Sequence, residues 1–273
     1  DYAGGRLEWY VPMAQYVYDV AVEELRRSDR RCIIVSGYGI ANGARTDKWN
    51  DSHAYIHALS TDGSELWSKS LGGVFQGISI AVADLNLQNT RNVIAAVDTT
   101  WEYRKKDAGR MTVFTAKGTT MADVHYPHSM GGRRVVVCDL LGVQNRNQII
   151  CGGNDGKIRV FDAALHILRE SKAGKTPTVQ AAADMTGDGR IELIVTTGDN
   201  ELSLLDRDLH TLCKHRFPSV KKRTRVAVAD VTGNGSNDIV LANGRVTLVT
   251  LVERENSDRT ALSVGPGSAA DNL

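Results

Sequence analysis

The chain has 273 residues, of which 42% are hydrophobic and 24% are charged, and its formal net charge is +1. This composition is typical of a soluble globular protein and excludes a disordered chain. No apolar run approaches the roughly 18 residues that a membrane span needs, and the near-neutral charge argues against nucleic acid as a partner. The length fits one large β-domain or two smaller domains.

The start of the chain and its cysteines bear on the cellular compartment. The chain begins at Asp1 rather than Met, which indicates that it was processed or excised. We expect an extracytoplasmic or secreted location, with the compartment otherwise open. The four cysteines have no CxxC spacing and lie in or next to apolar runs, so we expect buried thiols rather than a zinc site.

One sequence pattern occurs five times along the chain. An apolar run ends in an acidic residue, a polar loop follows, and a second apolar run ends in Gly or Asp. The five segments are 20–37, 80–98, 135–153, 181–198 and 226–244. The acids that end the first run in the last three segments, Asp139, Asp184 and Asp230, are spaced by 45 (184 − 139) and 46 (230 − 184) residues. This period matches the roughly 40 to 50 residues of a four-stranded propeller blade.

Two further strands are expected after each second run. A tight turn leads into a third strand of alternating polarity at 154–162, 198–206 and 243–251. Asp155-Gly156 and Asn243-Gly244 supply the positive φ that two-residue hairpins need. A fourth strand follows, as at 63–71 and 166–170. The pattern therefore predicts an all-β fold, a β-propeller of four-stranded antiparallel blades.

The predicted blades cover most of the chain as one domain at 1–263, with a C-terminal tail at 264–273. About five blades are visible, and their expected ranges are 16–71, 78–120, 133–172, 179–217 and 224–263. Residues 4–11 resemble an outer strand, and we expect them to complete the last blade and close the ring, which would remove two free sheet edges. A fragment of a larger ring is the alternative.

The loop after the first strand carries the most specific signal. It reads DMTGDGRIE at 184–192 and DVTGNGSND at 230–238. This loop, set between apolar strands, resembles the FG-GAP or VCBS repeat of integrin-like β-propellers, and the repeats are also similar to PQQ-type propeller repeats. The resemblance covers most of residues 16–252 and is degenerate in the first three repeats. It implies a radial fold but no single activity.

Alternate positions of these two loops offer oxygen atoms that could surround a hard cation. Such an alternation suits Ca²⁺, and FG-GAP propellers with this loop commonly bind that ion. The alternative is a metal-free turn in which Asp accepts backbone N–H bonds, and Thr in place of the usual Asp or Asn at the third position favours it. The candidate metal ligands are Asp184, Thr186, Asp188, Arg190 through its carbonyl, Glu192, Asp230, Thr232, Asn234, Ser236 through its carbonyl, and Asp238.

Five long insertions are expected on one face of the propeller. They occupy 38–53, 98–110, 121–134, 171–178 and 214–225, and carry 16 Lys and Arg against 6 Asp and Glu. A basic face with interleaved aromatics suits an acidic partner or ligand. The alternative is that the aromatics pin the insertions while the cations are solvated. The candidate residues of this insertion face are Trp49, His53, Trp101, Tyr103, Arg104, Lys105, Lys106, His125, His128, Arg133, Arg134, Lys221, Lys222 and Arg223.

These features predict a non-enzymatic interaction or assembly module, since the chain contains no GxSxG or HExxH motif. A protein partner or self-association is expected, for instance by addition of the strand at 244–253 to a neighbouring sheet, and an acidic carbohydrate is a further candidate. The alternative is a carbohydrate-active or cofactor-binding propeller enzyme, polysaccharide lyase-like or quinoprotein-like. Such an enzyme should gather Trp49, Trp101, His53, His125 and Arg133 at the channel mouth.

Overall fold

The computed structural model describes residues 8–25, 31–86, 90–99, 109–128, 130–143, 146–217, 224–242, 246–253 and 260–264. Within these ranges the secondary structure consists of strands, turns and bends, and none of it is helical. Accordingly, the part of the chain that is described has no helix able to cross a membrane. The predicted all-β class is confirmed.

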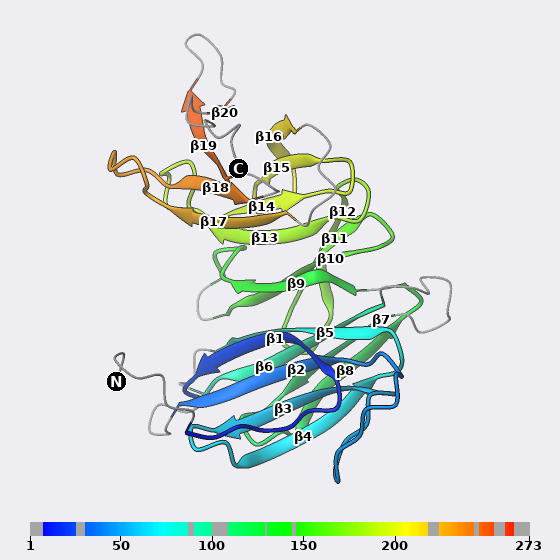
Figure 1. Cartoon of the computed structure of the whole chain (residues 1–273). Helices are drawn as coiled ribbons and strands as arrows, with labels where there is room; N and C mark the ends of the chain where they lie inside the picture. Colours follow the sequence, from blue (N-terminus) through cyan, green and yellow to red (C-terminus); the bar gives the residue numbers. More distant parts are fainter. Residues whose placement is uncertain are drawn as a thin grey trace. The chain divides into compact units, whose positions relative to one another are not determined.

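The chain forms two compact units, which divide between Val135 and Val136. The first unit holds two consecutive groups of four antiparallel strands, which we call blades 1 and 2 (Figure 1). One residue pair, Tyr38 with Gly77, joins them into a single sheet. Their strands are β1 (Tyr16–Glu23), β2 (Cys32–Tyr38), β3 (Ala54–Ser60), β4 (Glu65–Gly72), β5 (Gln76–Ala83), β6 (Asn92–Thr99), β7 (Gly109–Phe114) and β8 (Thr120–Tyr126).

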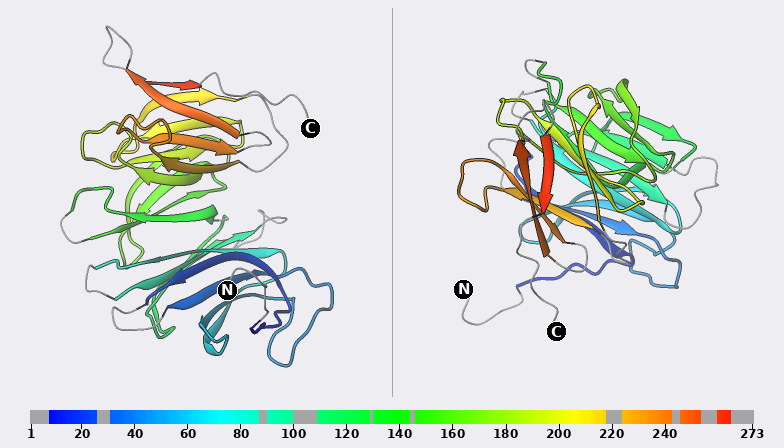
Figure 2. Two further views of the ribbon diagram at one scale, coloured as in Figure 1. Left: turned by 60° about the vertical axis from the view of Figure 1, so that its left-hand side comes forward. Right: turned by 90° about the horizontal axis from the view of Figure 1, so that it is seen from above.

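The second unit is built from three four-stranded sheets, which we call blades 3, 4 and 5 (Figure 2). Each is a simple up-and-down sheet in which consecutive strands pair. The unit boundary falls inside the first of these strands. The strands are β9 (Met130–Cys138), β10 (Gln148–Gly153), β11 (Lys157–Phe161), β12 (Ile167–Lys172), β13 (Thr178–Ala183), β14 (Glu192–Thr196), β15 (Glu201–Leu205), β16 (Thr211–Arg216), β17 (Arg225–Ala229), β18 (Asp238–Ala242), β19 (Val246–Glu253) and β20 (Thr260–Val264).

The four-strand repeat predicted from the sequence is therefore found five times in the described residues. Short, small-residue runs such as Ala181–Ala183 form first strands, and the Asp155-Gly156 pair makes the expected hairpin turn with φ of 85° at Gly156. Whether the five blades form one domain at 1–263 stays a prediction, because the two units are compact separately.

Two predicted boundaries are wrong. The second blade does not end at 120, since β8 continues to Tyr126, and the third blade does not begin at 133, since β9 begins at Met130. The segment 121–134 is thus mostly strand rather than an insertion loop. Its alternating exposed and half-buried side chains are those of a strand with one solvent-facing side.

The N-terminal segment does not complete the last blade in its described part. Residues 8–11 form no strand, and the indole N–H of Trp9 donates a 2.9 Å hydrogen bond to the carbonyl of Thr61 in the β3–β4 turn. The ring of Trp9 covers Gly63 of the same turn. Residues 4–7 lie outside the described ranges. The segment at 8–11 therefore belongs with blade 1.

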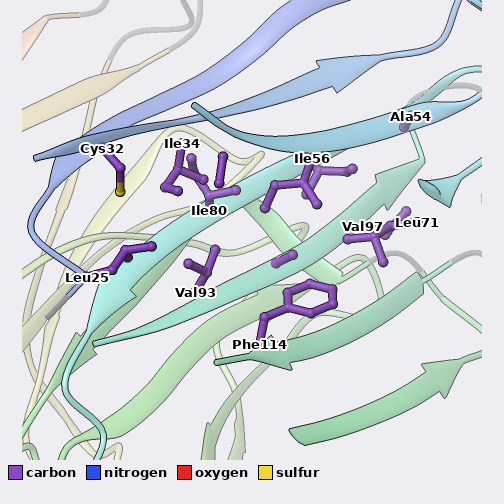
Figure 3. Close-up of a cluster of buried hydrophobic side chains, with 13 residues drawn as sticks. Leu25, Cys32, Ile34, Ala54, Ile56, Leu71, Ile80, Val93, Val97 and Phe114 are labelled. Carbon is purple, nitrogen blue, oxygen red and sulfur yellow. The ribbon is translucent and has the colours of Figure 1, made fainter. Parts of the chain in front are cut away.

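Each unit has an apolar core between its sheets. In the first unit, Ile34, Ile56, Val93 and Phe114 are fully buried between blades 1 and 2 (Figure 3). Burying a side chain of this size contributes roughly 1.5–3 kcal/mol, so this cluster dominates the stability of the unit. The apolar runs of the sequence repeat supply these residues.

In the second unit, alternate residues of a single strand serve two different cores. Leu193 and Val195 of β14 pack towards blade 3, whereas Ile194 between them packs towards blade 5. Successive side chains of a strand point to opposite faces, so a strand that is buried on both faces is apolar throughout. This explains why the second run of each repeat reads as a continuous hydrophobic stretch.

Candidate functional site

The β13–β14 loop at 184–191 is closed by its own carboxylates. Asp184 accepts hydrogen bonds from the backbone N–H of Gly187 (Oδ1, 2.7 Å) and of Gly189 (Oδ2, 2.9 Å). Asp188 accepts one from Arg190 N–H at 2.9 Å. The two glycines have φ of 76° and 81°, a conformation that favours glycine. The sequence D-x-x-G-x-G thus encodes a turn folded around one aspartate.

The carboxylate of Glu192 completes this loop from the start of β14. It is 4% exposed and accepts hydrogen bonds from the N–H groups of Met185 (2.8 Å) and Thr186 (3.2 Å). Burial raises the pKa of Glu192 in spite of these bonds, and the negative charges of Asp188 and Asp184 act in the same direction. The raised pKa shows a carboxylate in an electronegative, poorly solvated position.

The β17–β18 loop at 230–237 repeats this arrangement. Asp230 accepts hydrogen bonds from Gly233 N–H (2.7 Å) and Gly235 N–H (2.8 Å). Asp238, 2% exposed, accepts bonds from Val231 N–H at 3.0 Å and from Thr232 N–H at 3.1 Å. The second copy therefore has the same fold as the first, with Asp in place of Glu at the buried position.

One side chain links the two loops across neighbouring blades. The amide of Asn237 donates a 2.9 Å hydrogen bond to the backbone carbonyl of Asp184. Asn237 is the residue before β18, and Asp184 directly follows β13. The loops of blades 4 and 5 are consequently held next to each other.

The donor set and the geometry of these loops differ in their fit to a cation. The side chains are hard oxygen donors, which suit Ca²⁺. Nevertheless, the carboxylates of Asp184, Asp230, Glu192 and Asp238 are engaged by backbone N–H groups, and the described residues contain no group of three or more His, Cys, Asp or Glu side chains arranged to hold a metal. Backbone N–H groups thus close these turns, and calcium binding at the two loops stays a prediction.

Of the insertion-face residues, Trp49 lies inside the protein. It is 9% exposed and its ring meets that of His57 edge-on, with 4.5 Å between centroids. Lys48 lies over the indole, 5.9 Å from its centroid. The indole therefore anchors the β2–β3 loop at 39–53. This agrees with the alternative in which the aromatic residues pin the insertions to the protein.

His57 is the most unusual titratable group of the first unit. It is fully buried on β3, and its Nε2 lies 2.8 Å from the amide nitrogen of Gln15. The other ring nitrogen, Nδ1, has no hydrogen-bond partner within the described part of the chain. Burial lowers the pKa of His57 to about 4, so the ring is neutral at physiological pH.

The histidines predicted for the insertion face are separated along the chain. His53 lies in the turn before β3, where its Nδ1 is 3.0 Å from the side-chain oxygen of Asn50. His125 lies on β8, and its Nε2 is 3.8 Å from Asp123. His128 follows β8 and its ring lies 5.7 Å from that of Tyr126. His125 is thus part of a strand and not of an insertion, contrary to the sequence interpretation.

Several cations that were predicted to lie in insertion loops lie on strands. Arg133 and Arg134 lie on β9 rather than in a loop, and only the backbone of Arg133 is described. In the predicted 98–110 insertion, Arg110 is already on β7 and binds Asp123 through two hydrogen bonds of 2.8 Å. Burial would raise the pKa of Asp123, but hydrogen bonds from Arg110 and Thr112 outweigh it and lower the pKa.

The remaining candidates of the insertion face lie outside the described residues. They are Trp101, Tyr103, Arg104, Lys105, Lys106, Lys221, Lys222 and Arg223. The interpretation of these residues as an acidic-ligand surface stays a prediction.

A polar pocket that the sequence did not reveal lies in the second unit. It has a volume of about 290 Å³ and is lined by β15, by β16 and by the segment that joins blades 3 and 4. Its floor includes the buried side chains of Ser203 and Leu205. Charged groups of both signs surround it: Lys172, Asp199, Glu201 and Lys214. The available signal was on β15, where Glu201, Ser203 and Leu205 alternate with apolar residues. Alternate residues of a strand share a face, so this face of β15 carries the polar groups Glu201 and Ser203.

Comparisons with known proteins bear on the fold. No protein-family model matches the chain, and neither does any curated protein sequence. Among solved structures, the chain is similar to the exotype rhamnogalacturonan lyase YesX (TM-score 0.56, 14% identity, 85% of this chain and 47% of that one) and to the Bacillus licheniformis rhamnogalacturonan lyase PL11 (TM-score 0.56, 13% identity, 92% and 55%). It is also similar to BBS1N solved in complex with ARL6DN (TM-score 0.53, 9% identity, 93% and 84%).

The chain spans about half the length of the two lyases that it matches. At identities this low, the similarity concerns the path of the backbone and not the side chains of any site. Together with the five four-strand groups, it shows that the chain has a fold of the β-propeller type.

Proposed function

We propose that this chain is a non-enzymatic β-propeller module for interaction and assembly. One observation carries the proposal: a patch of apolar side chains on one face of β1, namely Val17, Val20 and Val22, which are 57%, 51% and 53% exposed. We call it the β1 patch. Monomeric proteins rarely expose several large apolar side chains on one element, so such a patch marks an interaction surface.

The strand register explains why this surface is apolar. Ala21 pairs with Ile34, and both pack in the core of the first unit. Because side chains alternate along a strand, Val20 and Val22 point to the opposite face of the sheet. The same face is covered on the neighbouring strands, since Val35, which pairs with Val20, is 6% exposed, and His57, which pairs with Val35, is 0% exposed. The exposed apolar surface of blade 1 is therefore confined to its edge strand β1.

The β1 patch is proposed to mediate self-association with a second copy of the chain. β1 is hydrogen-bonded to β2, and no second strand pairs with it in the described ranges. An edge strand with apolar side chains is suited to association with another sheet. The strand first suggested by the sequence for this role is excluded in its described part, because β19 is already paired on both sides, with β18 and with β20.

Light scattering over a range of protein concentrations tests this function. We expect the wild-type chain to form a dimer or larger assembly and the double variant Val20→Ser/Val22→Ser to be shifted towards monomer. The matched control is Val231→Ser, at an equally exposed valine (55%) in the β17–β18 loop. A wild-type chain that is monomeric at every concentration, or a control that dissociates as the double variant does, would contradict the proposal.

The insertion face belongs to the same proposal, as a surface for an acidic protein or an acidic carbohydrate. Its support is the excess of Lys and Arg in the sequence of the five segments. Six of these 16 cations, Arg104, Lys105, Lys106, Lys221, Lys222 and Arg223, lie outside the described ranges. Replacing Lys221, Lys222 and Arg223 with Gln should weaken salt-dependent retention on an immobilised polyanion. Retention equal to that of the wild type would show that these three cations do not take part in binding the polyanion.

A second candidate function is that of a carbohydrate-active propeller. Its support is the similarity to two rhamnogalacturonan lyases, each matched over about half its length. Of the residues expected at the channel mouth, however, Trp49 is buried against His57, and His125 lies on β8 beside Asp123. Assays for lyase activity on acidic polysaccharides would decide between the two candidates.

The family and the calcium sites are further parts of the proposal. The DMTGDGRIE and DVTGNGSND loops support membership of the FG-GAP or VCBS repeat family. Calcium at these loops would stiffen them and would supply no chemistry. The hydrogen bonds that already occupy Asp184 and Asp230 argue for a contribution smaller than that of an EF-hand site.

A further inference from the structure

The polar pocket of blade 4 has a wall that is fixed before any ligand arrives. Ala173 N–H donates a 2.9 Å hydrogen bond to Gly156 of blade 3, and Gly198 N–H donates one of 2.6 Å to Lys175. The segment from 173 to 175 is therefore tied to both neighbouring blades. Gly174, with φ of 115°, gives the chain the bend that this path needs. A wall held on both sides provides the preorganised cavity that small ligands require.

Donors and acceptors are placed side by side on the floor of the pocket. The ammonium of Lys214 lies 2.8 Å from Oε1 of Glu201, and the hydroxyl of Ser203 donates to the same oxygen at 3.2 Å. Ser203 is 3% exposed, so this hydroxyl is fixed in the interior of the pocket. A neighbouring ammonium and carboxylate match two adjacent hydroxyl groups, since each hydroxyl donates to one partner and accepts from the other.

Two further charged groups at the rim are not used by the protein. Neither the ammonium of Lys172 nor the carboxylate of Asp199 makes an ion pair or side-chain hydrogen bond with another described residue. They add one more donor group and one more acceptor group. The pocket thus holds two cations and two carboxylates, and it has no net charge.

This balance of charge and size defines the class of ligand. The carboxylates of Asp199 and Glu201 offset the two ammonium groups, so the pocket has no net electrostatic attraction for a phosphate or carboxylate. A volume of about 290 Å³ is at the lower end of small-molecule pockets, which suits one ring and not an extended chain. We propose that this pocket binds a single ring of a neutral, hydroxyl-rich sugar.

The sugar site is distinct from the assembly surface. The pocket lies in the second unit, between residues 172 and 214, whereas the β1 patch is in the first unit. Loss of one function would leave the other intact. A failure of the sugar experiment therefore does not count against self-association, and the reverse also holds.

Methyl NMR on the whole chain tests the proposal directly. The methyl glycosides of glucose, galactose, mannose and rhamnose are titrated into protein labelled at Leu and Ala methyl groups. We expect at least one glycoside to cause a saturable shift at Leu205 and Ala173, which line the pocket, while Leu202 on the opposite face of β15 is unmoved. The affinity should be millimolar, because a ligand of so few atoms gains little binding free energy.

Two variants connect the shifts to the proposed groups. Glu201→Gln removes the ion pair with Lys214 and should weaken binding at least tenfold, and Ser203→Ala should weaken it less. The matched control is Glu65→Gln, on the exposed β4 of the other unit, and thermal unfolding verifies that each variant is folded. The proposal is overturned by the absence of a saturable shift at Leu205 with all four glycosides. It is equally overturned by binding that Glu201→Gln leaves unchanged, or by a response to the zwitterion glycine alone.

Discussion

The β2–β3 loop of blade 1 and the β13–β14 loop of blade 4 differ in length, but both connect two strands and must satisfy the hydrogen bonds of their own backbone. Both are closed by an aspartate that accepts backbone N–H bonds: Asp51 from Asn42 and from Ala44 (3.2 Å), and Asp184 from two glycines. The short loop adds only further carboxylates, Asp188 and Glu192, which accept the remaining backbone N–H bonds. The long loop adds a small core of its own, in which Trp49 packs on His57.

This difference teaches how to interpret an aromatic residue in an insertion. A loop of a few residues satisfies its backbone N–H groups with nearby carboxylates, whereas a longer loop exposes more backbone and needs apolar contacts to stay folded. Trp49 therefore has a structural role, even though its neighbours in sequence are polar and charged. The predictions below test the two loops against each other.

The largest effect is expected from removing the core of the long loop. Trp49→Ala should lower the free energy of unfolding by about 4 kcal/mol, as is usual for a large buried aromatic. Urea denaturation monitored by circular dichroism measures this change. Trp9→Ala, at a half-exposed indole that covers only a turn, is the comparison and should cost clearly less. Equal losses for the two variants would contradict the structural role of Trp49.

The buried histidine of β3 that packs on this loop should make the first unit sensitive to acid. Burial lowers the pKa of His57 to about 4 from 6.5, so the unfolded chain takes up a proton at a higher pH than the folded chain. The stabilisation from neutral His57 is complete above pH 6.5 and is lost as the pH falls towards 4, for a total of about 3 kcal/mol. Urea denaturation at several pH values measures it.

His57→Gln should flatten this dependence, while His166→Gln, at an exposed turn of blade 3, should leave it in place. A slope between pH 6.5 and 4 that survives His57→Gln would assign the acid sensitivity to other groups.

The short loops should depend on their buried carboxylate more than on their exposed ones. Asp238→Ala removes the acceptor of two backbone N–H groups and of the Thr232 hydroxyl, and should cost about 2 kcal/mol. Asp188→Ala removes one exposed hydrogen bond and should cost about 0.5 kcal/mol or less. Thermal unfolding of both variants would reveal the order, and a reversed order would refute this account of the loop.

Calcium is expected to have the smallest effect. If the ion binds to the two short loops, adding Ca²⁺ should raise Tm by mass action and EDTA should lower it again. Asp188→Ala combined with Asn234→Ala should abolish the difference while leaving the long loop untouched. An identical Tm in EDTA and in Ca²⁺ would remove calcium from the description of these loops.

Much of the fold could be predicted from the sequence, because each repeat has the same order of apolar, acidic and glycine residues. The second strands are continuous apolar runs, and the D-x-x-G-x-G loops fix where β13 and β17 end. The boundary of blade 2 could not be predicted, because β8 has mainly polar, alternating side chains and only a short turn separates it from β9. The predicted insertion at 121–134 therefore included strand residues such as His125 and Arg134.

The candidate sites were less predictable than the fold. The sequence located the two loops and their carboxylates, but it does not reveal whether an aspartate oxygen accepts an N–H or faces a cation, and their role as metal ligands stays a prediction. The polar pocket was missed because its lining comes from β15, β16, the β14–β15 turn and residues 172–174, and only the β15 residues share a regular spacing. Only the strand pairing brings Glu201 and Lys214 together.

The hydrogen bond from Asn237 to the carbonyl of Asp184 has a consequence for the way the second unit comes apart. It ties the β13–β14 loop of blade 4 to the equivalent β17–β18 loop of blade 5, in addition to the apolar contacts between the sheets. In a chain of repeats, such ties set how far a local opening spreads. Blades 4 and 5 should therefore protect their amide protons from exchange as a pair, and removing the Asn237 amide should let the last blade fray alone.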